Sequence, residues 1–412
     1  MAFTARPLRT LRNATVADGS QVDLRLEGDT VAEVVPAGTL APDADAGADL
    51  DLSGFVLVTA PADAHAHLDK ACSWEAIDPP MGDLPRAVES WVAFTARVTE
   101  EDIWARARAQ ALAMLAQGTT AVRSHVDLHR HTDDPLRGVR ALVRVRDELR
   151  DVMDIQLVAL GGEFNSDEDY AQAVAAGVDL VGGAPHLAAD PLGEMRRELA
   201  LATRLGVGVD LHTDESLDGP VTIVEFARAV RDWDRPASAG HCVRLGTMPP
   251  EELAATVKEI AASDLGVITL PITNLYLQGW DHPVSTPRGL TAIRALLDAG
   301  VRVGAGADNV RDPFNPVGRS DALETASLLV TAGHLTLTEA IGLVGDGSRS
   351  VMGLPAAGPR PGARAELLAV RAASIGDLVA SASPDRFVVH AGRLVAHSRV
   401  DRHVAVPSTT TA

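Results

Sequence analysis

The chain is poor in cysteine and has no long hydrophobic run. Only Cys72 and Cys242 occur among its 412 residues, so it offers no disulfide framework and is typical of a protein in the reducing cytoplasm. Residues 1–20 lack the apolar core of a signal peptide, and no run of 18 apolar residues is present that would span a membrane. We therefore expect a soluble cytoplasmic protein.

Positive charge is scarce as well. The 37 Lys and Arg residues face 56 Asp and Glu residues, which gives a formal net charge of −19. An acidic protein repels nucleic-acid phosphates and anionic lipid headgroups, so we expect neither nucleic acid nor a membrane as a partner. Lys70 and Lys258 are the only lysines, so nearly all of the positive charge is carried by arginine. Codon bias is the default explanation for this preference. Hydrophobic residues, at 46%, are ample for a sizeable core.

The two ends of the chain share a pattern of short apolar runs separated by turn residues, which predicts β-hairpins. The expected strands are residues 8–16, 22–26 and 31–35 at the N-terminus, and 366–370, 377–380, 386–390 and 393–396 at the C-terminus. We expect residues 1–54 and 360–406 to form one small β-sandwich module.

The centre of the chain alternates apolar strands with amphipathic helices. The expected strands are residues 55–60, 119–125, 155–160, 180–184, 207–212, 237–241, 267–270 and 301–305, and expected helices include 101–117, 190–205, 249–263 and 286–299. Eight such units predict a (β/α)8 TIM barrel over residues 55–359. A doubly wound open sheet is the alternative, but no Gly-x-Gly-x-x-Gly turn follows an early strand.

Two histidines follow the first expected strand of the barrel. Side chains in a strand alternate faces, so His65 and His67 point the same way, roughly 7 Å apart along the chain. Two imidazoles converging at the end of a buried strand suit a divalent transition metal. The alternative is a pair of solvated histidines in a turn.

Polar residues also follow four other strands, at the end of a barrel where active sites gather. They include Ser124, His125 and Asp127 after strand 2, His212, Asp214 and Glu215 after strand 5, His241 after strand 6, and Asp308 and Asn309 after strand 8. Three imidazoles and a carboxylate suit one metal ion whose bound water ionises near neutral pH. Asp308 would accept the water proton, Glu215 would pass a proton to the substrate, and His241 would polarise the attacked atom.

These residues resemble the amidohydrolase superfamily and, within it, the cytosine deaminase-like branch. That branch carries His-x-His-x-Asp after strand 1, Val-Arg-(Ser/Thr)-His-Val-Asp on strand 2, His-x-Asp-Glu after strand 5, a His after strand 6, Leu-Gln-Gly after strand 7 and an Asp on strand 8. The residues here are His65, His67 and Asp69, then Val122 to Asp127, His212, Asp214 and Glu215, His241, Leu277 to Gly279, and Asp308. The resemblance implies His65, His67, His212 and Asp308 as metal ligands, with Glu215 and His241 catalytic.

The scarcity of lysine bears on this resemblance. Binuclear members of the superfamily bridge two metals with a carboxylated lysine after strand 4, and residues 155–186 contain none. We therefore expect one divalent ion, zinc or iron, with manganese as a further option. Lys70 follows the His pair in a sequence that resembles the triazine N-alkylamide hydrolases of the same branch. This resemblance implies that Lys70 contacts the substrate. The alternative is an ordinary lysine on the protein surface.

Three positions depart from the cytosine deaminase pattern. Gly161-Gly162-Glu163 replaces a Pro-Gln-Glu segment, Leu187-Ala188 follows Pro185-His186 where a Phe-Glu pair is usual, and Asn309 replaces a second Asp. A site that hydrogen-bonds its substrate rejects analogues that lack a group, so the ring differs from cytosine. We expect Lys70, Gly162, Gln278 and Asn309 to contact the substrate.

The resulting hypothesis is hydrolytic deamination of a small aminopyrimidine- or aminotriazine-like heterocycle through a metal-bound hydroxide, with release of ammonia. The alternative is an amidohydrolase that releases an alkylamine or opens a cyclic amide, with room for the leaving group near Lys70, Gly161 and Gly162. A barrel that only binds a ligand is the third hypothesis, which an intact set of site residues disfavours. We also expect a homo-oligomer.

Three further features are open to two interpretations. Residues 129–131, His-Arg-His, are a solvated loop in the favoured interpretation and a second metal site in the other. Trp91 and Phe94 are expected to pack a helix rather than stack on a substrate ring. His125 is expected to support the site through a hydrogen bond rather than to bind metal.

Overall fold

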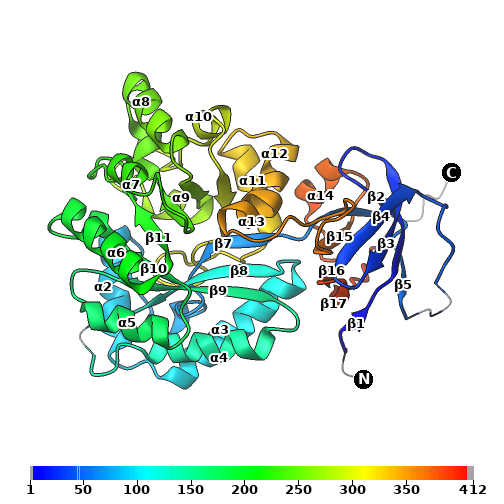
Figure 1. Cartoon of the computed structure of the whole chain (residues 1–412), viewed down its shortest axis with the longest axis horizontal. Helices are drawn as coiled ribbons and strands as arrows, with labels where there is room; N and C mark the ends of the chain where they lie inside the picture. Colours follow the sequence, from blue (N-terminus) through cyan, green and yellow to red (C-terminus); the bar gives the residue numbers. More distant parts are fainter. Residues whose placement is uncertain (1–2, 44, 46, 131, 406–412) are drawn as a thin grey trace, which may run out of the picture.

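The computed structural model describes residues 3–43, 45, 47–130 and 132–405. It contains an eight-stranded parallel sheet and a nine-stranded, mostly antiparallel sheet, which lie side by side in Figure 1. Both ends of the chain belong to the smaller part, on the right of that view. The expected TIM barrel with a β module built from the two chain ends is confirmed.

The parallel sheet is the barrel. Its strands follow one another in chain order, and they are β7 (Ala62–Ala66), β8 (Ala121–Asp127), β9 (Asp154–Gly161), β10 (Leu180–Gly183), β11 (Gly208–Thr213), β12 (Ala237–His241), β13 (Gly266–Thr269) and β14 (Val303–Ala305). A β-bridge between Ala66 and Asp308 joins the first strand to the segment after the last one. This bridge brings both ends of the sheet together at the edge where active sites of such barrels form.

Helices follow most of the strands and cover the outside of the barrel (Figure 1). They are α1 (Trp74–Ile77), α2 (Leu84–Thr95), α3 (Glu100–Ala116), α4 (Arg137–Leu149), α5 (Asp167–Ala175), α6 (Pro191–Leu205), α7 (Ile223–Ala229), α8 (Pro250–Ala261), α9 (Pro271–Leu277), α10 (Ile293–Asp298), α11 (Ala322–Thr331), α12 (Leu337–Gly342), α13 (Ser348–Val351) and α14 (Ile375–Ser381). Local sequence sets their ends: Thr99 accepts a hydrogen bond from the Asp102 N–H before α3, and Gly206 closes α6 with a φ of 73°.

The helix expected over residues 286–299 is shorter than predicted. Only Ile293–Asp298 is helical. Pro287 removes a backbone donor, and Gly289 adopts a φ of +61°, which a right-handed helix does not allow. The preceding residues form a loop at the rim of the barrel.

The second sheet holds the strands of both chain ends. They are β1 (Arg6–Pro7), β2 (Thr10–Thr15), β3 (Gln21–Glu27), β4 (Thr30–Pro36), β5 (Asp49–Asp51), β6 (Phe55–Thr59), β15 (Leu367–Arg371), β16 (Arg386–His390) and β17 (Arg393–Ser398). Their apolar faces share one cluster, in which Leu11 and Leu24 meet Leu367 and Val389. The strand expected at residues 377–380 is instead part of helix α14, because the Ser374 side chain caps a helix there.

The strand expected to open the barrel belongs to the other sheet. Strand β6 pairs antiparallel with β15, in register from Phe55 opposite Arg371 to Thr59 opposite Leu367. Pro61 follows two residues later and has no N–H to continue the ladder. Its carbonyl accepts a hydrogen bond from the Thr120 N–H, and the chain passes into the barrel at β7. The apolar run that precedes the histidines therefore ties the module to the barrel.

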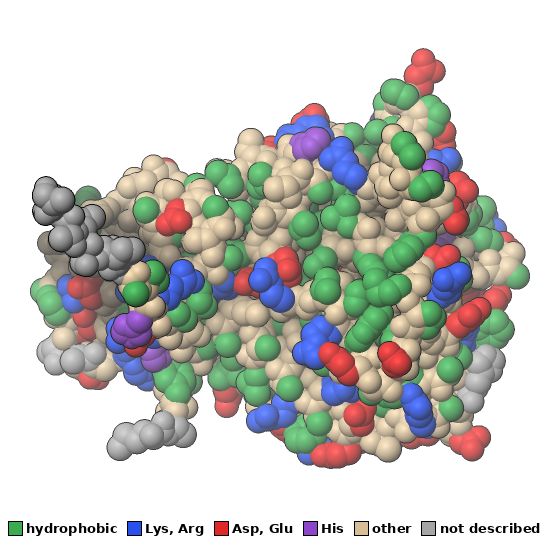
Figure 2. Space-filling view, turned by 180° about the vertical axis from the view of Figure 1, so that it is seen from behind, with side chains coloured by type: hydrophobic (Ala, Val, Ile, Leu, Met, Phe, Trp, Pro, Cys, Tyr) green, Lys and Arg blue, Asp and Glu red, His purple; other side chains and the backbone are tan. Residues whose placement is uncertain are grey.

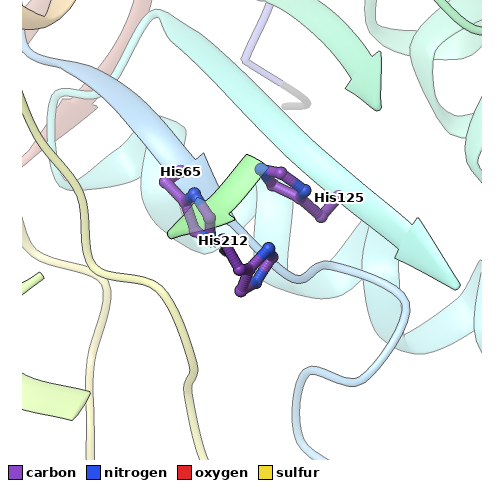
Figure 3. Close-up of side chains that lie close together, drawn as sticks. All are labelled: His65, His125 and His212. Atoms are coloured by element: carbon purple, nitrogen blue, oxygen red, sulfur yellow. Dashed lines mark hydrogen bonds between the residues drawn. The ribbon is translucent and has the colours of Figure 1, made fainter. Parts of the chain in front are cut away.

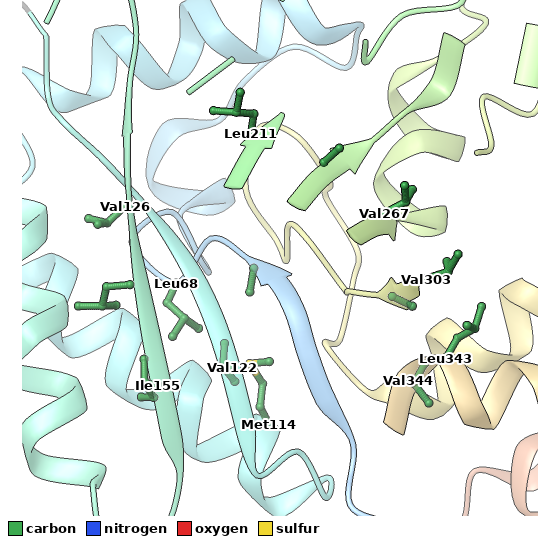
Figure 4. Close-up of a cluster of buried hydrophobic side chains, with 14 of the residues drawn as sticks. Leu68, Met114, Val122, Val126, Ile155, Leu211, Val267, Val303, Leu343 and Val344 are labelled. Carbon is green, nitrogen blue, oxygen red and sulfur yellow. The ribbon is translucent and has the colours of Figure 1, made fainter. Parts of the chain in front are cut away.

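The barrel's main core lies between its strands and the surrounding helices. Figure 4 shows Met114 of α3 and Leu68 against Val122 and Val126 of β8 and Ile155 of β9, with four of these five side chains no more than 1% exposed. Burying apolar side chains of this size stabilises the fold by about 1.5 to 3 kcal/mol each. This core holds rigid the strands whose ends carry the polar residues.

The surface mixes charged and apolar side chains. Figure 2 shows acidic and basic side chains interspersed with hydrophobic ones over one face of the molecule. Among the helices of the described residues, none combines the length and apolarity that crossing a lipid bilayer requires.

Candidate active site

The polar residues expected at the strand ends converge at one end of the barrel. His65 lies in β7 and His67 just beyond it, His212 is in β11, His241 is the last residue of β12, and Asp308 follows β14. His241 and Asp308 have φ values of 66° and 58°. Positive φ at residues other than glycine is uncommon and clusters at functional sites, where surrounding packing compensates for the strain.

Four side chains form a tight cluster that we call the ligand cluster: His65, His67, His212 and Asp308. The His212 Nε2 atom lies 3.2 Å from His65 Nε2 and 3.1 Å from His67 Nε2. The Asp308 Oδ1 atom lies 3.2 Å from His67 Nε2 and 3.8 Å from His65 Nε2. Each side chain is no more than 6% exposed. Figure 3 shows the rings of His65 and His212 beside that of His125, from three different strands.

This cluster fits a metal ion. Two ligand atoms that each lie about 2.1 Å from one ion are roughly 3.0 to 3.4 Å apart, as the closest pairs are here. The Asp308 carboxyl group is buried against imidazole nitrogens, with Oδ1 beside His65 and His67 and Oδ2 beside His241. Burial and the nearby Glu215 charge raise the Asp308 pKa well above its usual range. A divalent cation compensates such a carboxylate, whereas the same group alone would have to be protonated.

Glu215 lies beside the ligand cluster, between two further histidines. Its Oε1 atom is 3.3 Å from His241 Nδ1, and its Oε2 atom is 3.7 Å from His186 Nε2. Burial raises the Glu215 pKa to about 8 and lowers the pKa of His241 to about 3 and of His186 to about 4. The two rings are therefore neutral, and the carboxyl group exchanges its proton close to neutral pH. A group with this pKa is suited to proton transfer.

His241 is held by a residue that the sequence did not single out. Its Nδ1 atom also lies 2.9 Å from Oδ1 of the buried Asn274 on α9, and its Nε2 atom lies 3.8 Å from Asp308 Oδ2. The ring thus bridges Glu215 and the ligand cluster. The nearby His186 was noted in the sequence only as part of a departure from the family pattern.

Lys70 is buried rather than on the surface. It is 2% exposed, and its Nζ atom lies 2.7 Å from Asp127 Oδ1, 3.6 Å from Asp69 Oδ2 and 3.3 Å from His67 Nδ1. Burial lowers the Lys70 pKa, but the two carboxylates outweigh it and raise the pKa above its usual value. The indole N–H of Trp91 donates to the other Asp127 oxygen. Lys70, Asp127 and Trp91 together line the cavity described below.

A buried polar network lies beneath the ligand cluster. The Arg123 guanidinium donates through Nη1 to Asp210 Oδ2 at 2.7 Å and to Ser238 Oγ at 2.8 Å. The other Asp210 oxygen lies 3.5 Å from His125 Nε2 and 3.9 Å from His65 Nδ1. His125, His65 and His212 also form a group whose nitrogens could share an ion. The position of His125 beside Asp210 agrees with a supporting role, and carboxylates behind metal-bound histidines fix ring orientation.

The three other residues expected to contact the substrate are placed differently from one another. Gly162 and Asn309 line the cavity, although the Asn309 Nδ2 atom donates to Asp312 Oδ2 at 2.8 Å. Gln278 donates from Nε2 to the Glu215 carbonyl at 2.7 Å, so in this structure it supports the segment that carries Glu215. Contact of these residues with a substrate stays a prediction.

The interpretation of residues 129–131 as a solvated loop is wrong for His129. This side chain is 2% exposed, and burial lowers its pKa to about 4. It lies against Trp91 of α2, with ring centroids 6.3 Å apart. His131 lies outside the described residues. Trp91 packs against Phe94, as expected, at 5.9 Å between centroids, but it also faces the cavity.

A cavity opens from the ligand cluster to the surface. The space open to the centres of water molecules is about 170 Å³, more than ten times what one water needs. His67, His212, Glu215, His241 and Asp308 line its inner end. Its outer walls consist mainly of apolar side chains that the sequence analysis did not assign to the site: Leu84, Val88, Val92, Phe164, Leu187 and Phe314. The helical spacing of Leu84, Val88 and Val92 is a signal from which their shared face could have been predicted. The sequence carries no such signal for the three other residues.

Known proteins are similar to this chain in sequence and in structure. The sequence model of the amidohydrolase family matches residues 92–396. The pterin deaminase of Rhizobium rhizogenes is 30% identical over 399 residues, covering 92% of this chain and 89% of that protein. The N-isopropylammelide isopropyl amidohydrolase of a Pseudomonas species is 26% identical over 353 residues, covering 81% and 82%. The structure of 5-methylcytosine deaminase from Klebsiella pneumoniae superposes with a TM-score of 0.86 at 25% identity, covering 97% of this chain and 99% of that one.

Proposed function

Because the chain belongs to the amidohydrolase family, we propose that it is a metal-dependent hydrolase that removes an amino group, as ammonia, from a small nitrogen heterocycle. The observation that carries this proposal is the position of Glu215. A buried carboxyl group with a pKa of about 8 lies next to the ligand cluster, at the inner end of a cavity. Such a pairing of metal ligands and a proton donor suits attack of water on a ring carbon.

The metal would be held by His65, His67, His212 and Asp308. Imidazole and carboxylate ligands suit zinc, iron or manganese. When bound, a divalent ion lowers the pKa of its water from 15.7 toward roughly 7 and so supplies a nucleophile at neutral pH. The cluster contains no lysine, in agreement with a site for one ion.

Two side chains carry out the proton transfers, one at the attacking water and one at the substrate ring. Asp308 takes a proton from the attacking water, and the Glu215 carboxyl group gives its proton to the ring nitrogen next to the attacked carbon. His241 Nε2 lies 3.8 Å from Asp308 Oδ2, beside the same space, and would hold the attacking oxygen in place through a hydrogen bond. The carbon–nitrogen bond then breaks, the water oxygen becomes a ring carbonyl, and the second water proton leaves on ammonia. The proton held by Asp308 passes to the Glu215 carboxylate, which restores both groups.

The substrate ring belongs, in this proposal, to the aminopyrimidines or aminotriazines, either alone or fused to a second ring as in a pterin. The relative named for pterin deamination supports the fused ring, and the structural neighbour named for 5-methylcytosine supports the single one. Lys70 offers N–H donors and Asp127 offers acceptor oxygens at the cavity wall. Such a pair can hydrogen-bond to a ring edge that carries one carbonyl and one N–H group.

Release of an alkylamine is the second candidate, and the surroundings of Gly162 favour it. A side chain built on Gly162 would meet no atom within 4 Å, so the cavity has open space there for a substituent on the leaving nitrogen. Gly161, in contrast, is required by packing, because an added Cβ would lie 2.4 Å from the Tyr170 hydroxyl. The relative that acts on N-isopropylammelide supports the same candidate.

An assay of both leaving groups separates the two candidates. Protein loaded with zinc, iron or manganese is incubated with pterin, cytosine, melamine and their N-isopropyl derivatives, and ammonia and isopropylamine are quantified. Ammonia from the free amines supports deamination, and isopropylamine alone supports the second candidate. Neither product from any ring, with metal shown to be bound, contradicts both.

A further inference from the structure

The cavity extends well beyond the space that one ring needs at the ligand cluster. Helix α2 lies between β7 and α3, outside the regular pattern of the barrel, and forms one wall of the outer cavity. It turns Leu84, Val88, Trp91 and Thr95 toward the cavity, at spacings of four, three and four residues, which places them on one helix face. Two of these side chains, Leu84 and Val88, are aliphatic and only partly buried.

Two large apolar side chains stand on the opposite side of the mouth. Phe164 follows β9 and is 57% exposed, and Leu187 lies in the turn after β10 and is 53% exposed. Both line the same cavity. Exposed apolar side chains that line the rim of a cavity are typical of a surface that a ligand contacts.

Arg130 supplies a positive charge at this rim. Its guanidinium carbon lies 4.7 Å from the centre of the Phe164 ring, and it lines the cavity. Within the described ranges of the chain, no carboxylate pairs with Arg130, although the protein carries 56 acidic residues. Arg144, which stacks on Trp104 far from the cavity, pairs with both Glu101 and Glu148. Lys70, the other cation of the cavity wall, is neutralised by Asp127.

We infer that Leu84, Val88, Phe164, Leu187 and Arg130 form an outer subsite that binds an arm attached to the heterocycle. The arm is apolar, contains an aromatic ring, and ends in a carboxylate. The aliphatic face of α2 and the Phe164 ring cover the arm, and Arg130 pairs with the carboxylate. This inference rests on the proposed function for the ring at the inner end, but the subsite itself binds the arm without any reaction.

Arm fragments test the subsite independently of turnover. The probes are 4-aminobenzoate and its neutral analogue 4-aminobenzamide, each titrated against the whole protein by ligand-observed NMR, with and without metal. The benzoate is expected to bind more tightly than the amide in both forms of the protein. Binding that disappears when metal is removed would show that the carboxylate is a metal ligand, and would overturn the inference.

Variants assign the binding to Arg130. Arg130→Ala and Arg130→Gln are expected to weaken benzoate binding about twofold to fivefold, as loss of a half-exposed ion pair does, and to leave amide binding unchanged. Arg144→Ala is the matched control, an arginine stacked on an aromatic ring outside the cavity, and is expected to change neither. Equal benzoate binding by the wild type and both Arg130 variants would overturn the subsite.

Kinetics then connect the subsite with the reaction. The two substrates are pterin and pterin carrying a 4-aminobenzoate arm. Arg130→Ala is expected to raise the KM of the armed compound about twofold to fivefold and to leave the KM of pterin unchanged. If neither compound is turned over but the benzoate fragment still binds through Arg130, the proposed function fails and the subsite stands. If both are turned over with the same KM in wild type and variant, the subsite fails and the proposed function stands.

Discussion

Lys70 donates to Asp127 across 2.7 Å, and this ion pair forms part of the wall of the cavity beside the ligand cluster. The lysine is almost sealed from solvent, whereas the Asp127 side chain is 19% exposed. Trp91 donates to the second Asp127 oxygen, so the carboxylate is fixed between a cation and an indole. An arrangement of this kind has a structural and a binding consequence, and the two can be measured separately.

Replacement of Lys70 by Met is expected to lower both stability and substrate affinity. Removing one partner of a buried pair leaves the other charge uncompensated, which costs about 3 kcal/mol of the free energy of unfolding. KM for the substrate is expected to rise, with a smaller change in kcat. Lys258→Met, at the exposed lysine of α8, is the matched control. Denaturant unfolding and steady-state kinetics check both effects, and a Lys70→Met protein equal to wild type in stability and KM contradicts the assignment.

Glu215→Gln is expected to retain metal and lose turnover. The amide keeps the shape of the side chain but gives up no proton, and loss of a general acid costs about 10² to 10⁴ in rate. Metal content is measured by elemental analysis and activity by ammonia release. Glu225→Gln, on the outer helix α7, should behave as wild type in both assays. Turnover by the Glu215 variant at the wild-type rate removes this residue from the mechanism.

Asp308→Asn is expected to weaken metal binding, because an amide is a poorer ligand than a carboxylate and carries no charge. We expect the metal affinity, measured by competition with a chelator, to fall by more than about tenfold, since even residues behind the ligands affect it by 10-fold to 100-fold. Asp298→Asn, at the exposed last residue of α10, is the control. Unchanged metal affinity in Asp308→Asn would place the ion elsewhere.

Much of this fold could be predicted from the sequence because its signals are local. Apolar runs of strand length alternate with helices that end at glycine, and this pattern located the last seven barrel strands to within a few residues, whereas the first expected strand belongs to the other sheet. Thr59 and Leu367 show the limit of such signals. The run that ends at Thr59 has the composition of a barrel strand, but pairing across 308 positions places it in the other sheet, and periodicity carries no information on partners.

Some residues of the candidate site could likewise be predicted from the sequence, and others could not. His65, His67, His212 and Asp308 could be predicted because strand ends meet at one edge of a barrel, wherever they lie in the sequence. Phe164, Leu187 and Arg130 could not, because loops place them and loop conformation has no periodic signal. Roles in binding or catalysis for all these residues stay predictions, as do the module boundaries, the oligomeric state and the location in the cell.

Glu198 gives a prediction on stability that is independent of function. Its carboxyl group is 0% exposed, under Gly183 of β10, and neither oxygen meets a donor among the described residues. Burial and the Glu194 charge raise its pKa well above the usual range. The folded state therefore keeps a proton that the unfolded state loses above pH about 4.3, so stability falls as pH rises, by up to about 1.4 kcal/mol per unit.

Glu198→Gln removes this proton and with it the pH dependence. The variant is expected to be more stable than wild type at pH 8, with a difference that shrinks toward pH 5. Urea unfolding at four pH values measures the difference, and Glu252→Gln, at an exposed position of α8, is the control. A difference that stays constant over this range would show that Glu198 titrates normally in the folded protein.

The most direct test of the central claim is ammonia release by metal-loaded wild type and by Glu215→Gln, measured in parallel on pterin, cytosine and melamine. The account predicts one ammonia per molecule of one ring class consumed by the wild type, with dependence on added metal, and none from the variant. A wild-type protein that holds its metal and releases neither ammonia nor an amine, or a variant as active as the wild type, would contradict it.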